Sequence, residues 1–364
     1  RPDTTLARGG LVCQGARPME SPRPLDGLTC LVTGSAGFLG SNLVHALLTR
    51  GCTVHGFDKA PRTNEHPNLR WFRGDIRNAA DLTPALESVD TVFHTAAMIE
   101  TVTHAPRAFA TLVRSVNVEG TQTVIQAAQR QGVRRMVHTS SIVTVPEEER
   151  AGDREGTAYS AARDLYSSTK VLSEQLVLDA NGEQGMLTTA IRPGGIYGPG
   201  ERKTVIGPLV ESLKQGAPIV VFGDGSSRLD YTYIDNLVDA QIRAAERLVD
   251  GSPVCGRAYF VTDGAPINTG AFSQTLARDM GLEVRSLRIP GIVARGLAGA
   301  AERLFQVFGR PKPPFSLVDV DLCVRDTFFS IEDARADLEY EPIVDTREGL
   351  RRTAADARRY YDTL

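Results

Sequence analysis

A tyrosine and a lysine stand four positions apart, as Tyr166 and Lys170, in the segment Tyr-Ser-Ser-Thr-Lys. On a helix this spacing places both side chains on one face. Tyrosine alone is a poor base, because its unperturbed pKa is about 10, but a nearby ammonium group favours the phenolate. Tyr166 could then take the proton of a substrate hydroxyl while a hydride leaves the same carbon. The spacing is also common on solvated helix faces, so this interpretation depends on the other motifs.

A hydroxyl and an amide stand where they could assist this chemistry. Ser141 follows a predicted strand at 135–139, and sites in parallel sheets gather where strands end. Its hydroxyl could donate to the substrate oxygen beside Tyr166, or it could only cap a loop. Asn117 could hold a water in a proton relay, or it could bond only to backbone. His94 is interpreted as a residue that packs or hydrogen-bonds locally, and no histidine has the spacing of a metal site.

A glycine-rich turn lies between an apolar run at 28–33 and a helical pattern at 38–48. Gly34 would permit a tight turn, Gly37 a close approach of the backbone to a pyrophosphate, and Gly40 close packing of helix on strand. The unpaired N–H groups at the start of such a helix bind anions. The motif that would contact the pyrophosphate comprises Gly34, Gly37, Phe38, Leu39 and Gly40.

An aspartate ends the second predicted strand, about 20 residues beyond these glycines. The carboxylate of Asp58 would accept hydrogen bonds from a ribose hydroxyl and would repel a 2′-phosphate. This favours NAD over NADP as the cofactor. Lys59 and Arg62 follow closely and could soften that preference.

Strand-like and helical stretches alternate through the first half of the chain. The pattern predicts an α/β fold, a Rossmann-type doubly wound parallel sheet with a smaller, interleaved C-terminal substrate domain. We predict a mobile leader at 1–26, an NAD-binding Rossmann domain at 27–193, and a substrate-binding region with late Rossmann elements at 194–364. The predicted strands are 28–33, 53–57, 69–73, 91–94, 135–139 and 187–192, and the predicted helices are 38–48, 81–88, 116–131 and 165–180.

Composition narrows the classes of partner. The 364 residues include 41 basic and 44 acidic side chains, so the net charge is −3 and no broad positive field favours a nucleic acid. Five scattered cysteines without a CxxC pair fit a reducing, cytoplasmic setting. The most apolar stretch, 291–308, is interrupted by Arg295, Glu302 and Arg303, so no membrane span is predicted.

Together these motifs resemble the extended short-chain dehydrogenases/reductases and, within them, the 3β-hydroxysteroid dehydrogenases, including bacterial cholesterol dehydrogenases. The likeness runs from about residue 28 to the C-terminus. The segments that carry it are Asp58-Lys59-Ala60, Val92-Phe93-His94-Thr95-Ala96-Ala97, Thr139-Ser140-Ser141-Ile142, Tyr166 with Lys170, Leu178-Asp179-Ala180-Asn181-Gly182 and Ala190-Ile191-Arg192-Pro193.

The resemblance implies a site and a reaction. Ser141, Tyr166 and Lys170 would be catalytic, and a 3β-hydroxysteroid would be oxidised to the 3-ketone with NAD, in some members with a Δ5 to Δ4 shift. A homodimer is also implied. The residues that the resemblance and the motifs together assign to the cofactor are Gly34, Gly37, Phe38, Leu39, Gly40, Asp58, Lys59, Asp75, Ile76, Thr95, Ala96, Ala97, Asn117, Tyr166, Lys170 and Pro193.

Other functions stay open from the sequence. A decarboxylating 4-carboxysterol 3-dehydrogenase, or a sugar-nucleotide epimerase or dehydratase, would use the same motifs, and Arg202, Lys203 and Arg228 could meet a diphosphate. A non-catalytic NAD sensor would not need the catalytic residues.

The stretch at 291–308 also predicts an amphipathic helix. Its apolar stripe comprises Val293, Leu297, Ala300, Leu304 and Phe308, with Arg295, Glu302 and Gln306 opposite. We expect this stripe to pack on the second domain; the alternatives are a flap over an apolar channel and a peripheral membrane contact.

Overall fold

Seven parallel strands form the central sheet of the computed structural model, which describes residues 24–364 apart from 63–64, 147–150, 154–158, 162–163 and 310. The strands run in the order β12-β7-β5-β4-β1-β2-β3. Their bounds are β1 Thr29–Thr33, β2 Thr53–Asp58, β3 Leu69–Arg73, β4 Thr91–His94, β5 Arg135–Thr139, β7 Leu187–Pro193 and β12 Ala258–Val261.

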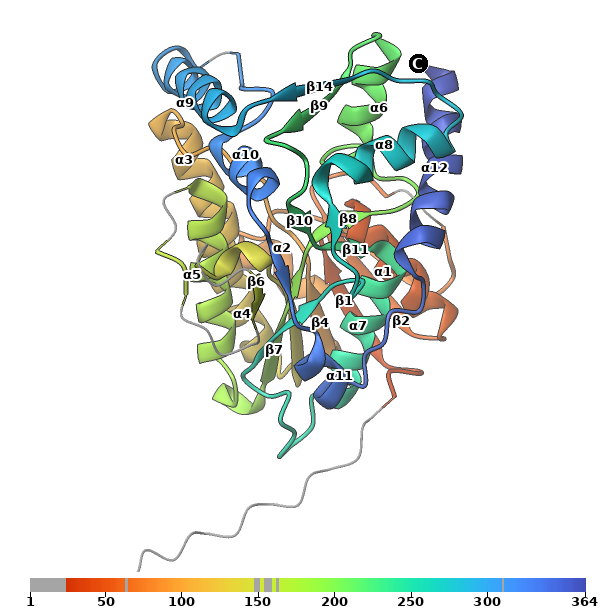
Figure 1. Cartoon of the computed structure of the whole chain (residues 1–364). Helices are drawn as coiled ribbons and strands as arrows, with labels where there is room; N and C mark the ends of the chain where they lie inside the picture. Colours follow the sequence, from red (N-terminus) through yellow and green to blue (C-terminus); the bar gives the residue numbers. More distant parts are fainter. Residues whose placement is uncertain (1–23, 63–64, 147–150, 154–158, 162–163, 310) are drawn as a thin grey trace, which may run out of the picture.

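Helices cover both faces of this sheet (Figure 1). On one face α1 (Phe38–Thr49) contacts α7 (Ile234–Arg247), and on the other α4 (Gly120–Arg130) contacts α2 (Ala79–Ala85) and α5 (Leu165–Asp179). Successive side chains of a strand point to opposite faces. Cys30 and Val32 of β1 accordingly join the core on the α1 side, while Leu31 joins the core on the α4 side. The predicted doubly wound α/β fold is confirmed.

The helical region before β5 is longer than predicted. It begins with α3 (Arg107–Arg114), which the sequence pattern did not indicate, and continues through a π-helical turn, η1 (Ser115–Glu119), into α4. A π-helical turn inserts one residue into the helical repeat and often lies at a functional site. Here the π-helical turn contains Asn117. The inserted residue changes the direction in which the Asn117 side chain points relative to α4.

The chain after β7 builds small elements around the carboxyl edge of the sheet. Two-stranded sheets pair β10 with β13, β11 with β8, β14 with β9 and β15 with β6. Two late elements, α7 and β12, return to the main sheet. The remaining elements are β6 Ala151–Asp153, β8 Gly195–Tyr197, α6 Ile206–Lys214, β9 Ile219–Phe222, β10 Arg228–Leu229, β11 Tyr231–Tyr233, β13 Ile267–Asn268, α8 Thr269–Asp279, β14 Ser286–Ile289, α9 Gly291–Phe308, α10 Leu317–Val324, β15 Phe328–Phe329, α11 Glu332–Leu338 and α12 Thr346–Thr363, with 3₁₀ turns η2 Ile142–Thr144 and η4 Glu183–Gly185.

The described chain includes the last three residues of the predicted leader, 24–26. Residues 1–23 of the predicted leader lie outside the described residues. Leu25, which the prediction also placed in the leader, is fully buried in the core on the α1 side, and its carbonyl accepts a hydrogen bond from the thiol of Cys52 at 3.2 Å. The division at residue 193 stays a prediction.

The helix predicted over 291–308 is present as α9, but the side that it buries is not the predicted apolar stripe. Ala294, Ala298 and Phe305 are buried, whereas the predicted stripe, including Val293 and Leu304, faces outward. Figure 1 shows α9 at one end of the molecule, near α3 and α10. In the described part of the chain, no helix has the length and apolar character needed to cross a bilayer.

Glu302 also departs from its expected place. It was assigned to the polar side of the helix, yet its side chain is fully buried. Its carboxylate accepts the backbone N–H groups of Thr103 and His104 at 3.1 Å and of Leu317 at 2.9 Å. A buried carboxylate must be satisfied by donors, so this contact fixes which side of α9 turns inward.

Candidate active site

The glycine turn lies between β1 and α1, at the carboxyl edge of the sheet. Gly34 has a φ of +72°, which favours glycine, and a Cβ there would lie 2.9 Å from the Cα of Ala96. A Cβ on Gly40 would lie 2.1 Å from the Gly34 carbonyl oxygen, so the helix packs directly on the turn. Gly37 is the N-cap of α1. The N–H groups of the first helical turn have no acceptor within α1 and can face an anion.

Asp58 ends β2 beside this turn, as predicted. Its two carboxylate oxygens accept the backbone N–H groups of Ala36 at 3.0 Å and Ala60 at 2.9 Å. Because each carboxylate oxygen can accept a further hydrogen bond, the group can still receive ribose hydroxyls. The glycine turn and this carboxylate therefore fit the pyrophosphate and the adenosine ribose of a dinucleotide.

The residues after β3 form an ion-paired cluster at the same edge. Asp75 pairs with Arg77 at 2.6 Å and with Lys59 at 2.9 Å. The bond from Arg77, followed by that from Lys59, lowers the pKa of Asp75 strongly. Lys59 is thus committed to Asp75, which limits its ability to hold a 2′-phosphate. Ile76 is buried and packs beneath Gly120.

The loop after β4 forms a wall of the glycine turn. The Thr95 hydroxyl donates to the Thr33 carbonyl at 2.7 Å, and the Ala96 N–H donates to the Thr33 hydroxyl at 3.3 Å. Ala97 follows in the same loop. Pro193, at the carboxyl end of β7, is buried and pairs with Val261 of β12. These predicted contact residues therefore all lie at the carboxyl edges of the sheet strands.

The three predicted catalytic residues are brought together where β5 ends. Tyr166 and Lys170 lie one turn apart on α5, and a hydrogen bond joins Tyr166 to the side chain of Ser141. The Lys170 Nζ is 5.9 Å from the centre of the Tyr166 ring and donates to the Thr139 carbonyl at 2.7 Å. Asp164 caps α5 by accepting the Ser167 N–H at 2.7 Å, which fixes where the helix begins.

The electrostatics of this group differ from the expectation. The sequence predicted that Lys170 would favour the Tyr166 phenolate. Instead burial, partly offset by the bond from Ser141, raises the pKa of Tyr166 to about 12. Burial lowers the pKa of Lys170 to about 8, against the opposing effect of Glu174. Desolvation is therefore the largest influence on the pKa of both groups.

Asn117 uses its amide fully within the protein. The Met98 N–H donates to Oδ1 at 2.8 Å, while Nδ2 donates to the Met98 carbonyl at 2.9 Å and to the Thr169 hydroxyl at 3.0 Å. Both N–H bonds of the amide are occupied, so Asn117 ties the loop after β4 to α5. The contacts include a side chain, Thr169, as well as the backbone of Met98, so Asn117 does not bond only to backbone, and its role in a proton relay stays a prediction.

A buried apolar cluster packs against Tyr166. Tyr166, Tyr231 and Leu322 pack against one buried cluster, and its members Phe260 and Phe329 stack with centroids 4.1 Å apart. The whole buried cluster is Ile142, Val143, Val145, Leu229, Phe260 and Phe329. It draws residues from η2, β10, β12 and β15, so only the fold assembles it.

A buried ion pair next to the site was missed by sequence reasoning. Glu174 is fully buried on α5 and accepts three hydrogen bonds from Arg192 of β7, the shortest at 2.6 Å. The spacing of Glu174 from Lys170 is again four residues, a signal that could have placed it on the same helix face. The pair locks α5 to the sheet one turn below Lys170.

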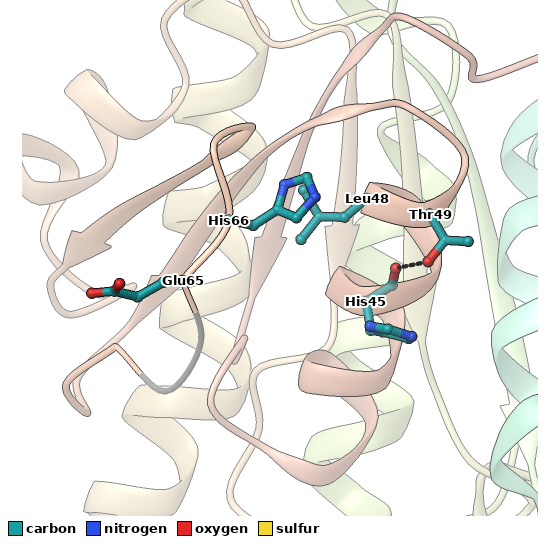
Figure 2. Close-up of a pocket in the computed structure, with 5 residues that line it drawn as sticks. All are labelled: His45, Leu48, Thr49, Glu65 and His66. Carbon is teal, nitrogen blue, oxygen red and sulfur yellow. Dashed lines mark hydrogen bonds between the residues drawn. The ribbon is translucent and has the colours of Figure 1, made fainter.

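A separate surface hollow lies away from this group. Figure 2 shows its lining residues, His45, Leu48, Thr49, Glu65 and His66. They come from the last turns of α1 and from the segment before β3, near the amino ends of β2 and β3. Because the glycine turn and Tyr166 lie at the carboxyl ends of the strands, the hollow is not part of the candidate site.

Comparisons with known proteins agree with this arrangement. The model of the 3-beta hydroxysteroid dehydrogenase/isomerase family matches residues 31–290. A relative from Mycobacterium tuberculosis named 3 beta-hydroxysteroid dehydrogenase/Δ5→4-isomerase is 42% identical over 330 residues, covering 88% of each chain. A Mus musculus relative named sterol-4-alpha-carboxylate 3-dehydrogenase, decarboxylating, is 33% identical and covers 89% of each chain.

A solved structure with the same fold is an epimerase from Methanothermobacter thermautotrophicus. It is 25% identical to this chain, and the superposition has a TM-score of 0.74 and covers 93% of this chain and 94% of that one.

Proposed function

Because this chain belongs to the 3-beta hydroxysteroid dehydrogenase/isomerase family, we propose that it oxidises a 3β-hydroxysteroid to the 3-ketosteroid with NAD. The observation that carries the proposal is the meeting of Ser141, Tyr166 and Lys170 beside the apolar cluster around Phe260. A steroid would remove a large apolar surface of its own from water on binding, at about 25 cal/mol per Å².

The roles of the residues follow from their positions. Ser141 donates to the substrate oxygen, and Tyr166 accepts the proton of the substrate hydroxyl. Lys170, anchored on the Thr139 carbonyl, supplies positive charge that stabilises the phenolate as it forms. NAD, when bound, supplies the hydride acceptor. The glycine turn and Asp58 hold the pyrophosphate and the adenosine ribose.

The structure favours a steroid over a sugar nucleotide. A nucleotide sugar needs basic groups around its diphosphate. Arg202 instead pairs with Asp356 at 2.6 Å, and Arg228 pairs with Asp326 at 2.8 Å. Arg228 also lies 4.2 Å above the Phe328 ring.

A 4-carboxysterol is the second candidate, favoured by the likeness to the mouse relative. Its carboxylate would require a cation near the reacting hydroxyl. Lys170 and Arg192 are the buried basic groups on α5 and β7, and they are held by the Thr139 carbonyl and by Glu174. These contacts favour a substrate without the carboxylate.

The deciding experiment incubates the purified protein with NAD and, separately, dehydroepiandrosterone, a 4-carboxysterol and UDP-glucose, follows NADH, and analyses the steroid and UDP-sugar products. We expect a 3-ketone from dehydroepiandrosterone, and the same analysis reports any Δ4 product. Turnover of the UDP-sugar without steroid turnover would overturn the proposal. Loss of carbon dioxide from the carboxysterol at a higher kcat/KM would promote the second candidate.

The preference for NAD is part of the proposal. Asp58 would repel a 2′-phosphate and would lose its bonds to the ribose if NADP were bound. We expect the unmodified protein to bind NAD more tightly than NADP in titration, and Asp58→Ala to narrow the difference. Equal binding of both dinucleotides by the unmodified protein would contradict this assignment.

We propose further that α9 contacts an anionic lipid surface. Its outward face carries exposed apolar side chains, with Ile292 at 87% and Val307 at 73% exposure, and Arg303 and Arg288 are exposed nearby. The one acidic residue of α9, Glu302, is buried. An amphipathic helix with basic flanks is typical of interfacial binding.

The test is sedimentation with vesicles of phosphatidylglycerol and phosphatidylcholine. Val307→Asn combined with Leu304→Asn should reduce the bound fraction, whereas Ile343→Asn, which removes an equally exposed apolar side chain at 58% exposure outside α9, should not. Equal binding by all three proteins would exclude α9 as the contact. Light scattering of the same samples without vesicles tests the homodimer that the family resemblance implies.

A cytoplasmic location completes the proposal. Cys30, Cys52, Cys255 and Cys323 are free thiols in the described part of the chain, which supports a reducing compartment.

A further inference from the structure

A buried chain of hydrogen bonds runs from the glycine turn to the catalytic helix. His94, fully buried at the end of β4, lies between the hydroxyls of Thr33 and Thr121, at 2.8 Å from Nδ1 and 2.9 Å from Nε2. The Thr121 hydroxyl in turn bonds to the Asn117 carbonyl at 2.7 Å. The sequence predicted that His94 packs or hydrogen-bonds locally, and these contacts name its partners.

The bond that the Thr121 hydroxyl donates to the Asn117 backbone carbonyl sets the direction that we assign to the other bonds of this chain. A carbonyl can only accept, so the single hydroxyl proton of Thr121 goes to Asn117. The Thr121 oxygen must then accept from His94, which places the ring proton on Nε2. Nδ1 is therefore an acceptor, and the Thr33 hydroxyl donates to it. Thr33 in turn accepts the Ala96 N–H.

Thr121 bonds to the backbone carbonyl of Asn117, and the side chain of the same residue makes the contacts that lead on to the backbone of Tyr166. The Asn117 amide donates to the Thr169 hydroxyl at 3.0 Å, and that hydroxyl donates to the Tyr166 carbonyl at 3.0 Å. The elements joined in this way are β1, β4, the π-helical turn η1, α4 and α5. At one end lies the turn that would hold the pyrophosphate, and at the other lies the residue that would take the proton.

A second imidazole provides an internal comparison. His138 stacks on His94 with ring centroids 5.3 Å apart and is similarly buried. Among the described residues its Nδ1 has no hydrogen-bond partner, and its Nε2 has one long contact, to Ser173 at 3.4 Å. Burial alone therefore does not produce the chain; the hydroxyls on both sides of His94 do.

The charge state of His94 suits a fixed connector. Burial, together with the positive charge of Lys170, lowers the pKa of His94 to about 3. A neutral ring keeps one donor and one acceptor, so the direction of the bonds persists through the neutral range.

We propose that His94 is a positioning residue: its neutral Nε2–H tautomer joins the glycine turn to the turn carrying Asn117, so that the dinucleotide cradle and Tyr166 keep one fixed relation. The inference rests on the proposed function, because a cofactor held in the cradle must face Tyr166.

The matched variants lie two residues apart on α4. Thr121→Val removes the hydroxyl that links His94 to the Asn117 carbonyl and nearly keeps the shape. Thr123→Val makes the same change where the hydroxyl bonds to the Glu119 carbonyl at 2.8 Å on the surface. A buried partner left unsatisfied has a large effect, so we expect Thr121→Val to weaken NAD binding about tenfold by calorimetry and to lower kcat. Thr123→Val should leave both within about twofold.

A double variant tests whether the chain acts as one unit. Thr33→Val removes the donor to His94 from the other end. If the two ends are coupled, the double variant Thr33→Val/Thr121→Val should bind NAD no more weakly than the worse single variant. Fully additive losses would overturn the coupling.

A readout independent of activity uses the ligand-free, ¹⁵N-histidine-labelled protein. We expect nitrogen NMR to show His94 as the neutral Nε2–H tautomer from about pH 5 to 8. The signal is assigned to His94 because it is absent from the spectrum of His94→Asn. A charged ring or an Nδ1–H tautomer would overturn the inference, even if Thr121→Val fails to fold. Lower thermal stability of Thr121→Val with unchanged NAD affinity and kcat would also overturn it. Failure of the unmodified protein to bind NAD would instead overturn the proposed function, while the tautomer would still decide the hydrogen-bond chain.

Discussion

Individual side chains at the candidate site are shaped by desolvation more than by mutual attraction. Tyr166 and Lys170 are one turn apart, yet burial raises the pKa of the phenol and lowers that of the ammonium. The ligand-free chain therefore holds Tyr166 protonated at neutral pH. Oxidation of an alcohol requires Tyr166 as the phenolate and Lys170 as the ammonium. Only a small fraction of the protein molecules carries both charges at the same time.

This state predicts a distinctive pH profile. The fraction with a Tyr166 phenolate and a Lys170 ammonium rises about tenfold per pH unit until Lys170 begins to lose its proton near pH 8, and then levels off. We expect log kcat/KM for steroid oxidation at saturating NAD to rise with a slope of about one below pH 8 and to flatten above it. A maximum near neutral pH would contradict the assignment.

Tyr166→Phe tests the proton acceptor directly. It removes the hydroxyl and keeps the ring against the apolar cluster, so we expect kcat to fall by roughly 10²–10⁴-fold with NAD binding largely kept. The control is Tyr259→Phe in β12, which removes a hydroxyl that bonds to Asp337 of α11 at 2.8 Å. Near-normal turnover by Tyr166→Phe would refute the mechanism.

At the scale of elements, α9 and α10 are attached to the loop after β4 through one buried carboxylate. Glu302 binds the backbone of Thr103 and His104 on that loop and of Leu317 at the start of α10. The same loop accepts the Leu165 N–H through the Val102 carbonyl at 3.3 Å, next to Tyr166. The outward-facing helix is thereby connected to the start of the catalytic helix.

Removing the Glu302 carboxylate should destabilise the folded protein. Glu302→Ala leaves several buried N–H groups without acceptors, and we expect the free energy of unfolding to fall by about 3 kcal/mol. Glu302→Gln, which keeps one acceptor oxygen, should lose less, and the exposed Glu283→Ala should change stability by less than about 0.5 kcal/mol. Denaturant unfolding of the three variants measures this order, and equal stability of Glu302→Ala and the parent protein would contradict it.

Across the whole molecule, a second buried carboxyl links the C-terminal elements to β11. Asp230 is almost fully buried, and its Oδ2 accepts the Phe329 N–H of β15 at 2.8 Å. Burial, partly offset by that bond and by Thr262, raises the pKa of Asp230 to about 7. An aspartate in an unfolded chain has a pKa of about 3.9.

The sign of this shift sets the pH dependence of stability. Because the folded state holds the proton more tightly, the contribution of Asp230 is fully present below about pH 4 and is lost as pH rises to about 7. A shift of three units corresponds to roughly 4 kcal/mol. As the pH rises from 4.5 to 7.5, the free energy of unfolding of Asp230→Asn should therefore increase relative to that of the parent protein. We expect this increase to be roughly 2–4 kcal/mol in denaturant unfolding. A constant difference across that range would exclude a titrating Asp230.

The sequence by itself determined the central architecture and the motif residues. Alternating apolar runs and helical patterns located the strands of the first half, since strands covered on both faces need continuous apolar side chains. The glycines at 34, 37 and 40 and the i to i+4 spacing of Tyr166 and Lys170 are local patterns, so the sequence could show them without the fold. Asp58 was placed by its position at the end of a strand.

Tertiary structure alone decided features that depend on contacts between distant segments. Nothing local indicates that Glu302 is buried while Val293 and Leu304 face outward, because an amphipathic pattern identifies two faces and the neighbours decide which one is covered. The pKa values of Tyr166 and Lys170 likewise depend on burial by residues far along the chain. The hydrogen bonds of His94 join positions 33, 94 and 121, and only the parallel sheet and its covering helix bring these three side chains within reach.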